Sequence, residues 1–158
     1  MKKGFTIIEI SIAMAVMAVG LVGIYALVPR VIKTISLNKD RFIASQLAAE
    51  GLELVRNKRD SNWLEQSVAS TTPWNSGLTS CSSGCEADYD DLSFTSYQGR
   101  LLKLDSNGFY NYESGEETKF RRKITINAEE EDVLSVKAEV FLPTGGSFSL
   151  EEKLYNWR

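Results

Sequence analysis

The first strong pattern along the chain is an apolar segment that runs from Phe5 to Val28. The residues that interrupt it are Thr6, Glu9, Ser11, Gly20, Gly23 and Tyr25. A helix of about 24 residues, with a rise of about 1.5 Å per residue, spans about 36 Å and crosses a hydrocarbon core of about 30 Å. The segment is too long for the apolar region of a secretory signal peptide, and no small-x-small cleavage site follows it. It therefore predicts a membrane-spanning helix.

Beyond Pro29, apolar residues recur at spacings of three, four and seven, as on one face of an amphipathic helix. These residues are Val31, Ile32, Ile35, Phe42, Ile43, Leu47, Leu54 and Val55. Proline is tolerated inside a membrane-associated helix, where it introduces a bend. Asp60, Ser61 and Asn62 are typical of a helix end. We therefore predict one helix from Phe5 to about Arg59, with a membrane-spanning part over 5–28 and an amphipathic part over 29–60.

From Tyr97 onward, apolar and polar residues alternate with a period of two, which indicates strands. The segments 101–104 and 109–112 flank an Asp-Ser-Asn-Gly turn and predict a hairpin. The same alternation continues over 119–127, 133–142 and 147–154. An antiparallel sheet of four or five strands with one apolar face needs a cover, and the amphipathic helix supplies it. The predicted fold class is therefore α+β.

The segment between the helix and the strands is rich in Ser, Thr, Asn and Gly, which is typical of a loop. We therefore predict a globular head over 61–158, with a long loop over 61–95 and the sheet over 96–158. The part of the chain beyond the membrane segment, 29–158, is long enough for one modest core.

Composition excludes several classes of function. The net charge of −3 and the pI of about 5.1 argue against a nucleic-acid-binding protein. Histidine, the commonest general base and zinc ligand, is absent from the sequence. The sequence also lacks a phosphate-binding loop and a nucleophile elbow. We therefore expect no enzyme activity and no cofactor. The basic triplet 121–123 alternates across a predicted strand, and we interpret it as a solvated edge.

Two cysteines, Cys81 and Cys85, enclose a Ser-Ser-Gly stretch in the polar loop. A single pair of this kind is typical of a disulfide in an oxidising compartment. We predict a local disulfide on an exposed loop; a free reactive pair and a C-x-x-x-C metal site are the alternatives. Nearby, Asp88, Asp90 and Asp91 offer the oxygen ligands that Ca²⁺ prefers. We interpret these residues as a solvated acidic turn, with a calcium site as the alternative.

Glu9 is the only charged residue inside the apolar segment. A carboxylate at the centre of a membrane-spanning helix costs roughly 2.5–3.5 kcal/mol, and less towards its end, so such a residue is a functional candidate. Cleavage after Gly4 would create an α-amino group on Phe5, and an ammonium and a carboxylate attract strongly in a low dielectric. If that amine belonged to a neighbouring subunit, Glu9 would set the axial register between subunits.

The residues that carry this pattern, Lys2-Lys3-Gly4-Phe5-Thr6-Ile7-Ile8-Glu9, resemble the class III leader of type IV pilins and type II secretion pseudopilins. The resemblance implies that a prepilin peptidase/methyltransferase cuts between Gly4 and Phe5 and methylates Phe5. It implies that residues 1–4 are the leader and that Glu9 is the assembly carboxylate. The family often has a proline near the middle of the apolar segment, whereas here Pro29 lies at its end.

The resemblance also implies partners and a location. The partners are other pilin subunits, an assembly platform and the membrane, with no clear nucleic-acid site. The precursor would span the membrane once with a cytoplasmic N-terminus, since Lys2 and Lys3 precede the helix. The product would be a filament at the cell surface or in the periplasm. The run 46–57 resembles the late helix of minor pilins, which favours a minor subunit; a secretion pseudopilin and an adhesive or DNA-binding tip pilin are the alternatives.

Overall fold

The computed structural model describes residues 4–69, 72–90, 93–143 and 145–157. The chain forms two compact units, Met1–Lys39 and Asp40–Arg158. We call them the N-terminal unit and the sheet unit. The helix α1 runs over Ile7–Ala69 and contributes to both units, with Pro29 inside it. The α+β class and the long N-terminal helix are therefore confirmed.

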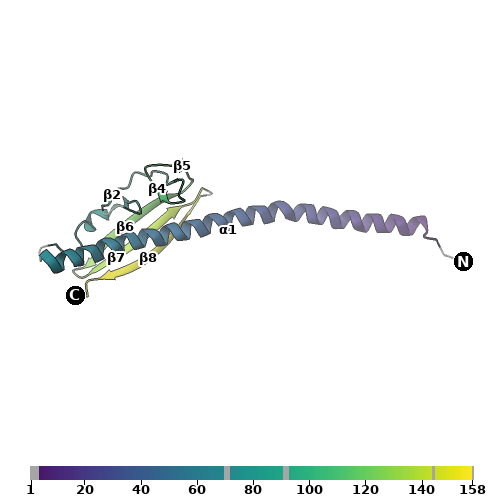
Figure 1. Ribbon diagram of the computed structural model, residues 1–158. Helices are drawn as coiled ribbons and strands as arrows, with labels where there is room; N and C mark the ends of the chain where they lie inside the picture. The colour runs from purple at the N-terminus through teal and green to yellow at the C-terminus, as the bar shows by residue number, and fades with distance from the viewer. Residues whose placement is uncertain (1–3, 70–71, 91–92, 144, 158) are drawn as a thin grey trace. The chain divides into compact units, whose positions relative to one another are not determined.

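The sheet unit is built around a five-stranded antiparallel sheet in the order β2-β1-β6-β7-β8 (Figure 1). Its three long strands are β6 (Arg121–Glu130), β7 (Val133–Phe141) and β8 (Ser147–Tyr155). They agree closely with the three alternating segments of the sequence. The two short strands at the other side are β1 (Cys85–Glu86) and β2 (Thr95–Ser96). The large sheet has five strands, within the predicted range, but two of them were not predicted: β1 lies in the segment predicted as loop, and β2 begins in it.

The predicted hairpin forms, but it belongs to a second sheet. Strands β3 (Lys103–Leu104), β4 (Tyr110–Asn111) and β5 (Glu116–Glu117) pair in the order β4-β3-β5. Backbone hydrogen bonds at Leu102 tie this small sheet to the start of β6, through Phe120 and Thr118. The prediction of a single sheet over 96–158 is therefore wrong, because these short strands pair with one another rather than with β6.

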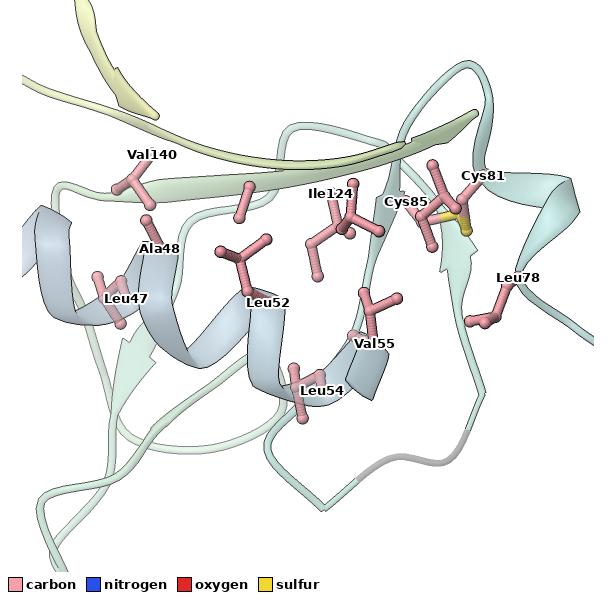
Figure 2. Close-up of a cluster of buried hydrophobic side chains, with 14 of the residues drawn as sticks. Leu47, Ala48, Leu52, Leu54, Val55, Leu78, Cys81, Cys85, Ile124 and Val140 are labelled. Atoms are coloured by element: carbon pink, nitrogen blue, oxygen red, sulfur yellow. A yellow bond between two sulfur atoms is a disulfide. The ribbon is translucent and has the colours of Figure 1, made fainter. Parts of the chain in front are cut away.

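The core lies between α1 and one face of the large sheet (Figure 2). On the sheet side, buried residues such as Ile124, Ile126 and Val136 occupy every second position along much of β6 and along β7. On the helix side, Gly51 brings the two layers close together. A Cβ atom at this position would lie 3.2 Å from the Cβ of Ala138. Such a contact is tighter than ordinary van der Waals packing, so the absence of a side chain at Gly51 lets the helix approach the sheet.

The helix face that covers the sheet differs from the predicted one at its beginning. Leu47, Leu54 and Val55 are buried as predicted, and the small residues Ala44 and Ala48 share their face. The earlier positions of the predicted stripe are exposed, namely Val31, Ile32, Ile35 and Phe42. The prediction that they pack on the sheet is wrong, because the core of the sheet unit begins only after Phe42.

The helix also continues past the predicted end at Asp60. Asn62, which was expected to help end it, is buried and donates hydrogen bonds from its amide to the backbone carbonyls of Trp74 and Ser76, both at 2.9 Å. Arg59 packs over the ring of Trp63 at 4.5 Å. These polar side chains therefore serve tertiary contacts rather than a helix cap, and α1 ends at Ala69.

Candidate functional sites at the helix N-terminus and in the sheet unit

Gly4 and Phe5 lie ahead of the first helical residue, Ile7. No heavy atom lies within 4 Å of the position that a Cβ would take at Gly4. Phe5 is 85% exposed. The peptide bond between these two residues is therefore accessible in the isolated chain.

Thr6 and Glu9 form a capping box at the start of α1. The Glu9 Oε2 atom accepts hydrogen bonds from the backbone N–H of Thr6 at 2.8 Å and from its hydroxyl at 2.9 Å. In return, Thr6 Oγ1 accepts a bond from the backbone N–H of Glu9 at 3.3 Å. This reciprocal arrangement satisfies N–H groups that have no partner inside a helix. The predicted role of Glu9 is intermolecular and leaves out Thr6, although the Thr-x-x-Glu spacing is the usual signal for such a cap.

The apolar part of α1 has the length and composition of a membrane-crossing helix, and its most apolar stretch is wholly exposed within the chain. Along one side, a shallow groove of about 340 Å³ is lined by Phe5, Glu9, Ala13 and Met17, with Ile10 and Met14 beside them. Because these side chains are exposed and mostly apolar, this surface needs lipid or another helix to cover it.

In the sheet unit, Arg122 lies fully buried beneath α1. Its Nη1 donates to Glu50 Oε1 at 2.8 Å and to the Leu47 carbonyl at 3.3 Å, both on the helix. Its Nη2 donates to the Ala87 carbonyl at 2.7 Å. The Nε has no hydrogen-bond partner within the described ranges. The interpretation of the triplet 121–123 as a solvated edge is therefore wrong for Arg122. The sequence carries a signal for this burial: Arg122 lies two positions from both Phe120 and Ile124, so its side chain points to the same buried face.

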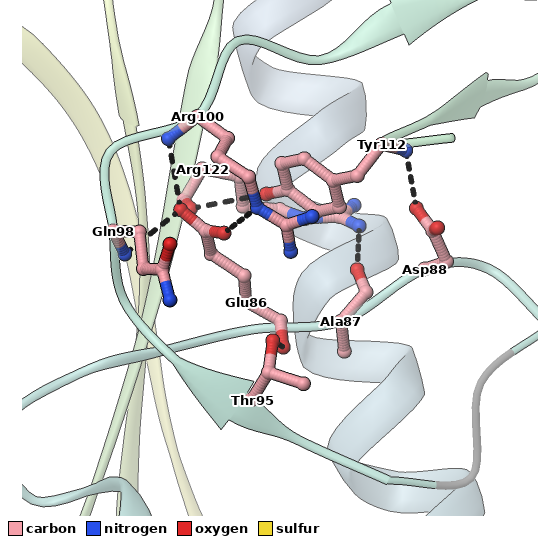
Figure 3. Close-up of polar contacts among 8 residues, drawn as sticks. All are labelled: Glu86, Ala87, Asp88, Thr95, Gln98, Arg100, Tyr112 and Arg122. Atoms are coloured by element: carbon pink, nitrogen blue, oxygen red, sulfur yellow. Dashed lines mark hydrogen bonds and ion pairs between the residues drawn. The ribbon is translucent and has the colours of Figure 1, made fainter. Parts of the chain in front are cut away.

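A second buried charge, Glu86, lies close to Arg122 (Figure 3). One oxygen accepts bonds from the backbone N–H groups of Gln98 and Arg100, at 3.2 and 3.0 Å. The other accepts from Arg100 Nε at 2.7 Å. The Arg100 guanidinium in turn lies over the ring of Tyr112, 4.6 Å from its centroid. Glu86 therefore holds the segment around 98–100 against β1.

Tyr112 connects the backbone of β6 with Asp88. Its hydroxyl donates to the Arg122 carbonyl at 3.3 Å, and its backbone N–H donates to Asp88 Oδ1 at 2.9 Å. Burial raises the pKa of the Tyr112 phenol well above its ordinary value. The network offers paired charges and satisfied carbonyls but presents no activated nucleophile. Its chemistry is that of a structural brace, and none of Glu50, Glu86, Arg100 and Tyr112 is among the residues predicted to be functional.

Cys81 and Cys85 form a disulfide, as predicted. Both residues are buried, beside Leu78 and close to Ile124 (Figure 2). The prediction of an exposed loop is therefore wrong. Cys85 lies in β1, whose only register partner in β6 is Ile124, so the disulfide holds the 3-10 helix η1 (Thr79–Cys81) against the core.

The calcium alternative rested on Asp88, Asp90 and Asp91. Asp88 is buried and accepts the Tyr112 N–H, and Asp90 lines a small polar cavity of about 80 Å³ together with Asp88 and Asp105. Asp91 lies outside the described residues. No group of three or more acidic, cysteine or histidine side chains among the described residues is arranged to hold a metal ion. The calcium site stays an untested alternative.

Comparison with known proteins finds a family match for the N-terminal part of the chain. Residues 1–25 match the family described as the prokaryotic N-terminal methylation motif. No curated protein and no solved structure matches the chain significantly. The matched region includes Gly4, Phe5, the Thr6–Glu9 capping box and most of the apolar segment. Together with the long apolar helix, the match is consistent with the type IV pilin family.

Proposed function

We propose, from the N-terminal methylation motif that this chain carries, that it is the precursor of a structural subunit of a type IV pilus-like filament. The motif leads directly into a helix whose apolar side chains are left exposed by the rest of the chain. This combination carries the proposal, because such a surface is stable only in lipid or against other helices. The same helix can thus serve first as a membrane anchor and then as an assembly surface.

Cleavage occurs between Gly4 and Phe5, and the new N-terminus at Phe5 is methylated by a prepilin peptidase/methyltransferase. The exposure of both residues and their position ahead of the helix support this step. A residue larger than glycine at the cleavage position would occupy space that the peptidase needs to reach the peptide bond.

Glu9 acts as the assembly carboxylate. Its Oε2 is held by Thr6 of the same chain, whereas no described residue donates to its Oε1. The capping box therefore leaves one oxygen able to accept a bond from the α-amino group of a neighbouring subunit. A pair of this kind in a low dielectric fixes the axial register of two helices, because a shift of one residue separates the charges.

Before assembly the precursor spans the membrane once, with Lys2 and Lys3 on the cytoplasmic side. An assembly platform then transfers it to a filament at the cell surface or in the periplasm. We favour a minor pilin because the run 46–57 resembles the late helix of minor pilins. A secretion pseudopilin fits the same leader. A DNA-binding tip pilin is less favoured, since the burial of Arg122 breaks up the basic triplet 121–123.

The direct test replaces Gly4 with a bulky residue and measures the mature N-terminus by mass spectrometry. Wild-type chain should begin at N-methylated Phe5, and Gly4→Leu should retain its leader and stay in the membrane. Gly23→Leu is the matched control, because it places the same side chain within the spanning helix but far from the bond. A Gly4→Leu chain that still begins at Phe5 would overturn the peptidase assignment. Mass spectrometry of purified surface filaments then separates major from minor subunits by abundance.

A further inference from the structure

The last turns of α1 carry exposed apolar side chains that the chain leaves uncovered. Leu64 is 67% exposed and Val68 is 90% exposed. They are four residues apart, so they lie on the same side of the helix. Glu65 lies beside them, without an ion pair in the part of the chain that the structure describes. We call Leu64, Glu65 and Val68 the distal patch.

A groove at the β7–β8 turn has complementary properties. It has a volume of about 380 Å³ and is lined by Arg41, Leu142, Gly145, Gly146, Ser147 and Phe148. Leu142 and Phe148 are partly buried against the core and give the groove an apolar wall. Gly145 and Gly146 contribute backbone but no side chain to its lining. Arg41 adds a positive charge that has no carboxylate partner within the described ranges. We call this the proximal groove.

The C-terminal end of α1, which carries the patch, and the β7–β8 turn, which carries the groove, lie at opposite ends of the sheet unit (Figure 1). The proximal groove includes Arg41, at the start of the α1 segment that belongs to this unit. At the other end, Trp63 Nε1 donates to Asn156 Oδ1 at 3.3 Å, next to the distal patch. The helix from Arg41 to Glu65 covers about 24 residues, or about 36 Å. The two surfaces therefore cannot meet within one copy.

We propose that the distal patch of one copy docks into the proximal groove of a second copy. Leu64 and Val68 cover the apolar wall, and Glu65 pairs with Arg41. The occupant is a second copy because one chain carries both halves, matched in polarity and in charge. A contact between two different patches at opposite ends is head-to-tail, and it generates an open chain of subunits rather than a closed dimer. The inference rests on the proposed filament function in its homopolymeric form, in which copies of this chain are direct neighbours rather than single minor subunits among others. It adds an axial contact between sheet units about 36 Å apart.

Cysteine cross-linking in assembled filaments tests this contact. The native cysteines are joined to each other, so a full-length Val68→Cys, Ser147→Cys chain adds the only free thiols. Mild oxidation should produce a ladder of dimers, trimers and longer products that needs both new cysteines. Leu64→Cys with Ser147→Cys is the second pair, and it should give the same ladder if Val68→Cys alone disturbs the helix end.

Charge reversal tests the pairing of Glu65 with Arg41. Adding Glu65→Arg to the double-cysteine chain should lower the ladder yield by at least about fivefold, because two cations then face each other. Adding Arg41→Glu to that chain restores the opposite charges and should restore the yield. Glu151→Arg is the matched control, because Glu151 is an exposed carboxylate on β8 that pairs with Lys137, away from both surfaces.

The remaining outcomes contradict either the proposed contact or the proposed function. Processed chain that enters filaments without a ladder would refute the inference and leave the proposed function intact. Cross-links that stop at dimers would show a closed contact, and cross-links to a different protein would show another occupant. A wild-type chain that is neither cut at Gly4 nor found in filaments would instead refute the proposed function itself.

Discussion

Arg122 and Glu50 form an ion pair of 2.8 Å that joins β6 to α1 across the core. The arginine is fully buried, whereas the glutamate side chain keeps 34% of its surface exposed. The two residues are 72 positions apart in the sequence. The same guanidinium also donates hydrogen bonds to the backbone carbonyls of Leu47 and Ala87. This one side chain therefore connects the helix, the sheet and the segment that follows the disulfide.

Removal of the Glu50 charge should therefore destabilise the sheet unit strongly. Glu50→Gln leaves a buried cation without its counter-charge, and we expect a loss of about 3 kcal/mol in the free energy of unfolding. Chemical denaturation of the detergent-solubilised chain measures it. Glu53→Gln is the control, because Glu53 pairs with Arg56 at the surface and should cost less than about 1 kcal/mol. Equal losses for the two variants would contradict the bracing role of Arg122.

High pH should destabilise the sheet unit through Tyr112. Burial raises the pKa of this phenol above its ordinary value of 10.0. The unfolded chain therefore loses the proton first, so the stabilising contribution is complete below about pH 10 and is lost as the pH rises further. Tyr112→Phe should show a shallower loss of stability above pH 10. The exposed Tyr155 gives the control variant Tyr155→Phe, which should follow the wild-type curve; a wild-type slope for Tyr112→Phe as well would refute the assignment.

Reduction of the disulfide should lower stability by a moderate amount. The ring closed by Cys81 and Cys85 is short, and the loop-entropy relation gives about 2 kcal/mol for such a ring. Denaturation curves with and without reductant measure the difference. A chain with both cysteines changed to alanine should not respond to reductant. An unchanged wild-type midpoint under reducing conditions would mean that packing alone holds η1 on the core.

Substitutions at Glu9 and Thr6 should distinguish a role of Glu9 in setting the axial register from its role in capping the helix. Glu9→Ala should be cleaved normally and remain in the membrane but stay out of filaments. Thr6→Ala removes the hydroxyl, at a cost of about 1 kcal/mol to the cap, and keeps the carboxylate. It should still be incorporated. Quantification of each variant in membrane and filament fractions decides the point, and equal exclusion of both would assign the effect to capping rather than to the charge of Glu9.

Most of the secondary structure could be predicted because its signals are local. Ile124 and Ile126, like Val136 and Val140, alternate with more polar residues, and this pattern specifies both the strands and the face that they bury. The end of α1 could not be predicted in this way. Asp60, Ser61 and Asn62 favour a helix end by themselves, and only the carbonyls of Trp74 and Ser76 give Asn62 a reason to stay in the helix.

The leader motif, the long apolar helix and the candidate roles of Gly4, Phe5 and Glu9 can be read from the sequence, because each depends on neighbours within a few positions. Tertiary structure alone decided which polar residues are buried. Glu86 looks like an ordinary surface charge in the sequence. The phase of Arg122 places it on the buried face of its strand, but the partners of both residues come from distant segments. A buried charge is tolerated only when those partners surround it. Its role therefore becomes visible only after the chain has brought the helix, the sheet and the connecting segment together.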